Sequence, residues 1–196
     1  GRLGLRVLKN VPVTEMAHAL AMGLRSGFGD DWIRLGNIKV FADGALGPRT
    51  AAMFDAYQGE PDNTGMLLID GEELAEIGIK AAAGGWGLAV HAIGDRANHE
   101  VLNALSIVRA HERSLGAPLL RHRIEHLQVM HPDDLARPAE LGVVASMQPI
   151  HATSDMRMAD QFWGERSRLA YAMKTQLDFG ARLALGSDFP VESADS

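Results

Sequence analysis

The chain has 196 residues, of which 46% are hydrophobic, enough for one sizeable core. Its formal net charge of −6, without a basic run, argues against binding to nucleic acid or to an anionic membrane surface. The lack of Cys excludes disulfides and thiolate-bound zinc. Neither a membrane-spanning run nor a signal-peptide pattern occurs. We expect a single soluble domain over residues 1–196. The absence of Cys does not fix the compartment, and the sequence favours the cytoplasm over export without deciding between them.

The first half of the chain alternates short apolar runs with helical periodicity. It predicts, in chain order, a strand at Leu5–Val13, a helix from Thr14 to near Gly27, a strand at Ile33–Ala42, a long loop over 43–66, a helix that follows Asp70, and a strand at Gly87–Ile93. Asp70 and Glu73 resemble a capping box, which places the start of the second helix.

The second half of the chain continues the same order. It predicts a helix at Ala97–Leu115, a strand at His122–Leu127, a helix at Asp133–Leu141, a strand at Val143–Met147, a helix at Glu165–Phe179 and a strand at Ala181–Leu185. Gly116 provides a C-terminal stop, and Pro138 is expected to bend or shorten its helix. The sequence therefore predicts six strands and five helices in strict alternation.

Strict alternation with buried strands indicates a parallel sheet with right-handed crossovers. An open doubly wound sheet and a closed eight-unit barrel both fit this pattern. A Rossmann sheet should carry G-x-G-x-x-G at a strand-to-helix turn, whereas "DGALGPR" lies in the long loop. A full barrel takes about 250 residues. We therefore expect an α/β fold that forms a partial TIM barrel of about six β/α units.

Polar side chains stand at the ends of several predicted strands. Lys39, His91, His126 and Asp188 each follow or end an apolar run. In a barrel the carboxyl ends of all strands meet on one face, where active sites lie. Two histidines and an aspartate there suit zinc or a similar divalent ion.

Each of these residues also has a structural interpretation. His91 could be a hydrogen-bonded histidine of the fold, Lys39 could pair with Asp43, and Asp188 could be a turn or capping residue. Unrelated structural residues have little reason to fall at the same end of four strands. The coincidence of the set favours a shared site.

Four motifs carry a family resemblance and span most of the chain from Gly36 to Ser193. They are "IKVFADGALGPRTAAM", "LAVHAIGDRAN", "RIEHLQVMHPDDLARPAELGVVASMQP" and "LGSDFPVES". With them the sequence resembles the amidohydrolase superfamily, in particular the family 3 amidohydrolases that include N-substituted formamide deformylases. The resemblance implies strands 3 to 8 of a (β/α)₈ barrel with one or two divalent metal ions, usually zinc, at its mouth.

The resemblance also implies roles for individual residues. His91 and His126 would be metal ligands, Asp188 would be a ligand and general base, and Lys39 would be a carboxylated ligand. We expect Asp95 and Glu125 to orient the ligand histidines. We expect a small-molecule amide substrate to be contacted by Arg49, Arg96, Gln148 and His151.

One departure from the family is the lack of a His-x-His pair, from which the family takes its first two ligands. The family's N-terminal β-domain and first two barrel strands have no counterpart here either. Such an arc would expose two sheet edges, so we expect homo-oligomers and an isolated segment that is inactive or folds only with another chain.

The leading interpretation is a segment of a metal-dependent hydrolase whose parent enzyme cleaves amide or formamide C–N bonds with metal-activated water. An inactive barrel fragment with a structural or regulatory role is the first alternative. A lyase or isomerase on the same barrel is the second, because fold does not fix the reaction.

Overall fold

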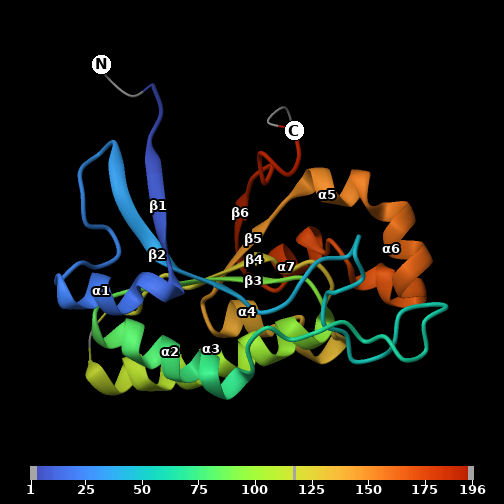
Figure 1. Cartoon of the computed structure of the whole chain (residues 1–196), viewed down its shortest axis with the longest axis horizontal. Helices are drawn as coiled ribbons and strands as arrows, with labels where there is room; N and C mark the ends of the chain where they lie inside the picture. The colour runs from blue at the N-terminus through green and yellow to red at the C-terminus, as the bar shows by residue number, and fades with distance from the viewer. Residues whose placement is uncertain (1–3, 117, 194–196) are drawn as a thin grey trace.

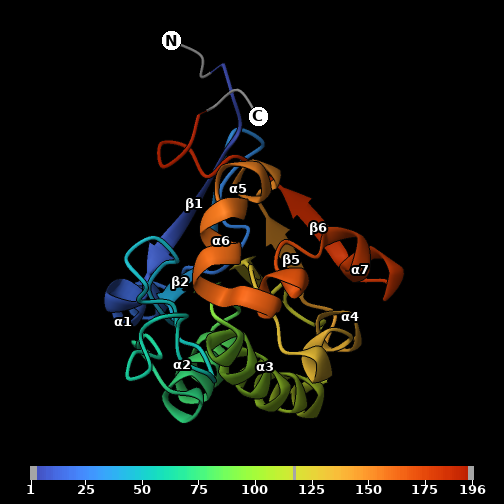
Figure 2. The same ribbon diagram turned by 90° about the vertical axis from the view of Figure 1, so that its right-hand side faces the viewer.

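The computed structural model describes residues 4–116 and 118–193. Its strands form one sheet in the order β1-β2-β3-β4-β5-β6, and every neighbouring pair is parallel. The strands are β1 Val7–Pro12, β2 Ile33–Phe41, β3 Leu88–Ala92, β4 Arg123–His126, β5 Val144–Met147 and β6 Arg182–Leu185. The predicted partial barrel of six strands is confirmed, and Figure 2 shows them fanning from β1 to β6 in a curved sheet.

Helices connect successive strands. The α-helices are α1 Met16–Ala21, α2 Gly71–Ala83, α3 Asp95–Leu115, α4 Arg137–Glu140, α5 Pro149–Ser154, α6 Met156–Trp163 and α7 Met173–Asp178. Short 3₁₀ helices are η1 Val13–Glu15, η2 Pro132–Asp134 and η3 Gly164–Leu169. In the described ranges no helix is both long and apolar enough to cross a membrane.

Local signals fix the two long helices where the sequence places them. The Asp70 side chain accepts a hydrogen bond from the Glu73 N–H at 2.8 Å and so caps α2. Gly116 adopts φ 65° and ends α3 in the left-handed conformation that favours glycine.

The prediction of one helix per connection is wrong between β5 and β6. Instead of one helix at Glu165–Phe179, the chain forms α5, α6, η3 and α7 there. Pro149 lies in the first turn of α5, where proline is tolerated because its missing N–H would be unpaired anyway. The helix expected up to Gly27 is also shorter, since α1 ends at Ala21.

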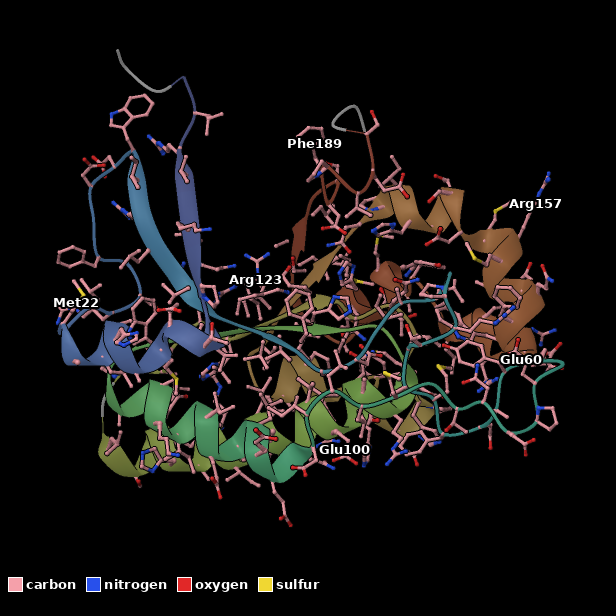
Figure 3. All side chains as sticks on the ribbon, viewed as in Figure 1. Met22, Glu60, Glu100, Arg123, Arg157 and Phe189 are labelled. Atoms are coloured by element: carbon pink, nitrogen blue, oxygen red, sulfur yellow. The ribbon has the colours of Figure 1, made fainter. Side chains whose placement is uncertain are left out.

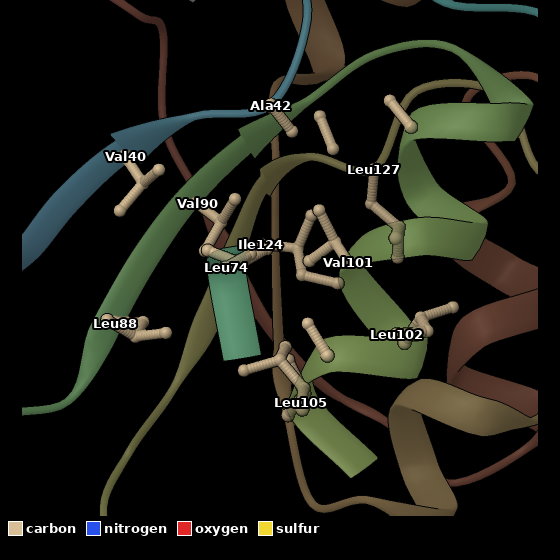
Figure 4. Close-up of a cluster of buried hydrophobic side chains, with 14 of the residues drawn as sticks. Val40, Ala42, Leu74, Leu88, Val90, Val101, Leu102, Leu105, Ile124 and Leu127 are labelled. Atoms are coloured by element: carbon tan, nitrogen blue, oxygen red, sulfur yellow. The ribbon is translucent and has the colours of Figure 1, made fainter. Parts of the chain in front are cut away.

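The core lies between the sheet and the helices on its outer face (Figure 1). Strand side chains such as Val40, Val90 and Ile124 pack there with Leu102 and Leu105 of α3, as Figure 4 shows. All five are at most 2% exposed, and each buried aliphatic side chain stabilises the fold by about 1.5–3 kcal/mol. Strand alternation then turns the intervening side chains toward the concave interior of the arc.

A second apolar cluster lies near the carboxyl ends of the strands. It joins the long loop to α6 through Leu46, Met53 and Tyr57 of the loop and Ala159 and Trp163 of the helix. The loop over 43–66 is therefore packed onto the fold at this end of the sheet, next to the cavity described below.

Candidate metal centre

The strand pattern brings Lys39 and His91 to the same concave face. Ile38, Val40 and Val90 belong to the core under the helices. Lys39 therefore points to the opposite face of β2, and His91, which is paired with Phe41 in the register, does so on β3. Figure 3 marks Arg123 of β4 in this interior, in the space between the β1–β2 pair and β6.

His126 reaches the same space through a change in backbone conformation. It is paired with Ala92, which belongs to the helix-side core, so simple alternation would bury the His126 ring under the helices. Instead His126 and Leu127 have φ values of 75° and 45°, and the strand ends there. The His126 ring centroid lies 4.7 Å from that of His91 and 5.7 Å from that of His151.

These side chains line one cavity of about 470 Å³ at the carboxyl ends of the strands. Asp188 enters it from the segment after β6 with φ 60°. Figure 3 marks the next residue, Phe189, beside β6 near the C-terminus. The polar lining residues are Lys39, His91, His126, Gln128, His151, Asp155, Asp188 and Glu192.

Three potential ligands converge most closely in this cavity. One ligand atom each of His126, His151 and Asp188 lies within 4.8 Å of the other two. The His151 Nε2 and Asp188 Oδ2 atoms are 3.5 Å apart, close to the ~3.4 Å that separates two ligands of a tetrahedral zinc ion at 2.0–2.2 Å. Within the described part of the chain, the buried Nδ1 atom of His126 has no hydrogen-bond partner. This donor set fits a divalent cation.

Burial keeps two histidines of the cavity, His91 and His126, in the neutral form that binds metals. It lowers the pKa of His126 to about 3, with further lowering from the nearby His91, His151 and Lys39. Burial also lowers the pKa of His91. It lowers the pKa of Lys39 as well, although the carboxylates of Glu125 and Asp188 oppose the shift. The amine of Lys39 is therefore easier to deprotonate than that of a solvated lysine.

His91 also contacts the backbone of the long loop. Its Nε2 lies 2.8 Å from the Gly44 carbonyl oxygen and 3.6 Å from the Asp43 Oδ1 atom. Asp43 itself is buried and accepts hydrogen bonds from the N–H groups of Ala52, Ile93 and Gly94. Asp43 thus anchors the loop that His91 contacts.

The other residues predicted from sequence divide between the cavity and its surroundings. Gln148 is buried, and its Nε2 donates to the Ser146 carbonyl oxygen at 3.3 Å. Glu125 lies beside His91 in the sheet register, and its carboxylate is 2.6 Å from Arg123 Nε. His151, predicted to contact substrate, also belongs to the group of potential ligands.

Gln148 and Glu125 are not among the residues that line the cavity, and three further predicted residues also lie apart from it. Arg49 pairs with Glu60 at 2.8 Å; its guanidinium stacks on the ring of Phe162, and Figure 3 marks Glu60 at the far end of the loop. Asp95 accepts hydrogen bonds from the N–H groups of Phe54 and Arg96 at the start of α3. The Arg96 side chain is exposed.

Asp155 and Glu192 are cavity residues that the sequence analysis did not select. Asp155 lies four residues after His151, a spacing that brings two side chains together only on a helix. The sequence does not predict the helix α5 at this position, so the spacing could not be used. Glu192 lies inside the motif "LGSDFPVES", but its spacing from Asp188 carries no recognisable ligand pattern.

Comparisons with known proteins agree with this architecture. The family model described as "Amidohydrolase family" matches residues 1–196. Putative amidohydrolase YtcJ of Bacillus subtilis is 37% identical over 166 residues, which are 84% of this chain and 30% of that protein. Protein LONG AFTER FAR-RED 3 of Arabidopsis thaliana is 35% identical over 193 residues, 97% of this chain and 33% of that protein.

A solved structure shows the same fold. An uncharacterized metal-dependent hydrolase from Pyrococcus furiosus superposes with a TM-score of 0.87 at 31% identity, and the match covers 100% of this chain and 39% of that one. The chain therefore spans about a third of the length of the two curated relatives. On these matches and the six-stranded barrel segment, the chain belongs to amidohydrolase family 3.

Proposed function

We propose that the protein containing this chain hydrolyses the C–N bond of small amides or formamides with water activated by one or two divalent ions, of which zinc fits best. The observation that carries this proposal is the convergence of His126, His151 and Asp188 in the cavity at the carboxyl ends of the strands. Lys39 and His91, which line the same cavity, would complete the ligand set.

The cation, Asp188 and Lys39 would have different roles in the reaction. A bound cation lowers the pKa of water and polarises the substrate carbonyl. Asp188, partly exposed at the cavity, would accept a proton from water and pass it to the leaving amine. The lowered pKa of Lys39 favours the neutral amine that carboxylation by carbon dioxide requires.

The cavity also offers surface for the substrate. Phe41, Leu46 and Met158 provide apolar contacts beside the polar cluster, which suits an amide with an apolar substituent. Gln148 would act through His126, whose pKa its side-chain amide raises. Contact between Arg49 and substrate would require opening of its ion pair with Glu60, and contact with Arg96 would require its exposed side chain to turn inward.

The test is metal content and turnover of the longest natural polypeptide that carries this chain. We expect one or two zinc ions per protomer and hydrolysis of N-formyl or N-acyl amines. Asp188→Asn should lower kcat by at least ~100-fold through loss of the proton acceptor. The matched control Asp178→Asn changes an exposed aspartate paired with Lys174 and should leave kcat unchanged. Protein without metal or turnover would favour the inactive structural alternative instead.

A further inference from the structure

His151 presents its two ring nitrogens to different carboxylates. Its Nε2 atom faces Asp188 at 3.5 Å. Its Nδ1 atom faces Glu192 Oε1 at 3.5 Å and Asp155 Oδ2 at 3.8 Å. One ligand atom each of His151, Asp155 and Glu192 lies within 4.8 Å of the other two. The imidazole therefore stands between two groups of potential metal ligands.

The Nδ1 side of His151 has an unsatisfied polar atom. The residue is 8% exposed, and its buried Nδ1 atom has no hydrogen-bond partner among residues 4–116 and 118–193. A buried polar atom of this kind is costly unless a ligand or an ion satisfies it. The 3.5 and 3.8 Å separations are long for hydrogen bonds but close to the ~3.4 Å between two ligands of one tetrahedral cation.

We propose that His151 Nδ1, Asp155 and Glu192 bind a second divalent transition-metal cation, at a site that the proposed hydrolytic function does not use. One imidazole and two carboxylates match the donors of zinc or manganese. The imidazole disfavours calcium and magnesium, which take oxygen ligands. Since this site uses the other nitrogen of His151, it does not require an ion beside Asp188. When both sites are filled, the ring bridges the two ions as an imidazolate, and its N–H proton is released to solvent.

The second site joins two segments that are far apart in the sequence. Asp155 lies between α5 and α6, whereas Glu192 follows β6 in the same segment as Asp188. The Ser154 hydroxyl donates to Glu192 Oε1 at 3.2 Å and already links these segments weakly. A cation held by Asp155 and Glu192 would fix the segment after β6 and thereby position Asp188 in the cavity.

The experiment is a calorimetric titration with Zn²⁺ of the longest natural polypeptide that carries this chain. Wild type is expected to bind one more equivalent of zinc than Glu192→Gln, which lacks the second site. Asp188→Asn is expected to keep the zinc of the second site, and to lose the zinc beside Asp188 or bind it at least ~10-fold more weakly. Asp155→Asn repeats the test at the second carboxylate. The matched control Glu165→Gln changes a glutamate whose side chain is 82% exposed and should bind as wild type does. Circular dichroism confirms that each variant is folded.

A second readout follows the segment itself. Hydrogen exchange of residues 186–193 should slow when Zn²⁺ is added to wild type, and this protection should be lost in Glu192→Gln. If Glu192→Gln and Asp155→Asn bind as many equivalents as wild type, the second site is refuted while loss of metal in Asp188→Asn still supports the hydrolytic one. If only the Glu192→Gln and Asp155→Asn variants lose zinc, the second site stands and the hydrolytic site fails. A wild type that binds no zinc refutes both.

Discussion

Asp43 shows how one side chain can hold the long loop against the sheet. Its carboxylate accepts hydrogen bonds from the N–H of Ala52 in the loop and from Ile93 and Gly94 just after β3. Burial raises the pKa of Asp43 to about 6 although these bonds favour the charged form. The loop contacted by His91 therefore depends on one carboxyl group.

Replacement of Asp43 by Ala should destabilise the protein. It would leave three buried N–H groups without their acceptor, at about 1–3 kcal/mol each, so we expect the free energy of unfolding to fall by about 3 kcal/mol or more. Urea denaturation measures this change. Asp62→Ala, at an exposed position in the same loop, is the control. Equal stabilities of the two variants would contradict the anchoring role.

Individual site residues were predictable where strand geometry alone places them. Lys39 and His91 lie on the inward face at the ends of strands, which follows from alternation and from the common end of parallel strands. His151 was predicted at the site as a substrate contact. Its place beside His126 and Asp188 could not be predicted, because it depends on α5, a six-residue helix without strong periodicity. The place of Arg49 depends on how the loop packs on Phe162, a contact distant in sequence.

At the scale of elements, the loop and α3 meet with no space between them. A Cβ atom on Gly94, the residue before α3, would lie 1.9 Å from the Ala52 carbonyl oxygen and 2.5 Å from its carbonyl carbon. These are backbone atoms, so the clash cannot be relieved by turning a side chain. Glycine is required here by the close approach of two backbones.

Gly94→Ala should therefore separate the loop from α3. We expect a loss of about 2 kcal/mol or more in the free energy of unfolding, at the upper part of the range for overpacked sites. Thermal unfolding followed by circular dichroism provides the measurement. Gly4→Ala is the matched control, because a Cβ atom at Gly4 meets nothing within 4 Å. A Gly94→Ala protein as stable as this control would show that the loop is not packed as described.

The elements also show where sequence periodicity fails. The strands and the helices α2 and α3 were predictable because caps and apolar spacing agree with tertiary packing. The apolar spacing over Glu165–Phe179 predicted one helix, but Tyr171 has φ 53° and its N–H donates to the Gln128 carbonyl oxygen at 2.7 Å. This contact with the segment after β4 interrupts the helix, and tertiary structure overrides local propensity.

At the scale of the whole molecule, a buried polar network ties α3 to the start of β4. His122 Nδ1 accepts the Leu88 N–H at 3.0 Å, while its Nε2 lies 2.9 Å from Glu112 Oε1. Arg109 donates to the other Glu112 oxygen and to the carbonyls of Leu120 and other residues. Burial lowers the pKa of His122, which is therefore neutral in the folded protein.

The network predicts a stability loss in acid. The pKa of His122 is lower in the folded protein than the value of about 6.5 that it has in the unfolded chain. Neutral His122 therefore contributes fully to the free energy of unfolding above about pH 6.5. This contribution is lost as the pH falls from there through the folded pKa. Burial raises the pKa values of Asp43 and Asp95, so these two residues make the free energy of unfolding rise, not fall, as the pH is lowered. The effect of His122 is therefore measured by comparing two proteins. Between pH 7.5 and 5, the free energy of unfolding from urea titrations should fall less for His122→Phe than for wild type. Parallel pH profiles for the two proteins would contradict it.

Above all, we propose that side chains from the end of β4, from α5 and from the segment after β6 hold a divalent ion in one cavity. The most direct measurement is an anomalous difference map at the zinc absorption edge, from crystals of the protein grown with Zn²⁺. We expect a peak within bonding distance of His126, His151 and Asp188. A well-ordered structure in which these three side chains diverge, with zinc absent from the cavity, would contradict it.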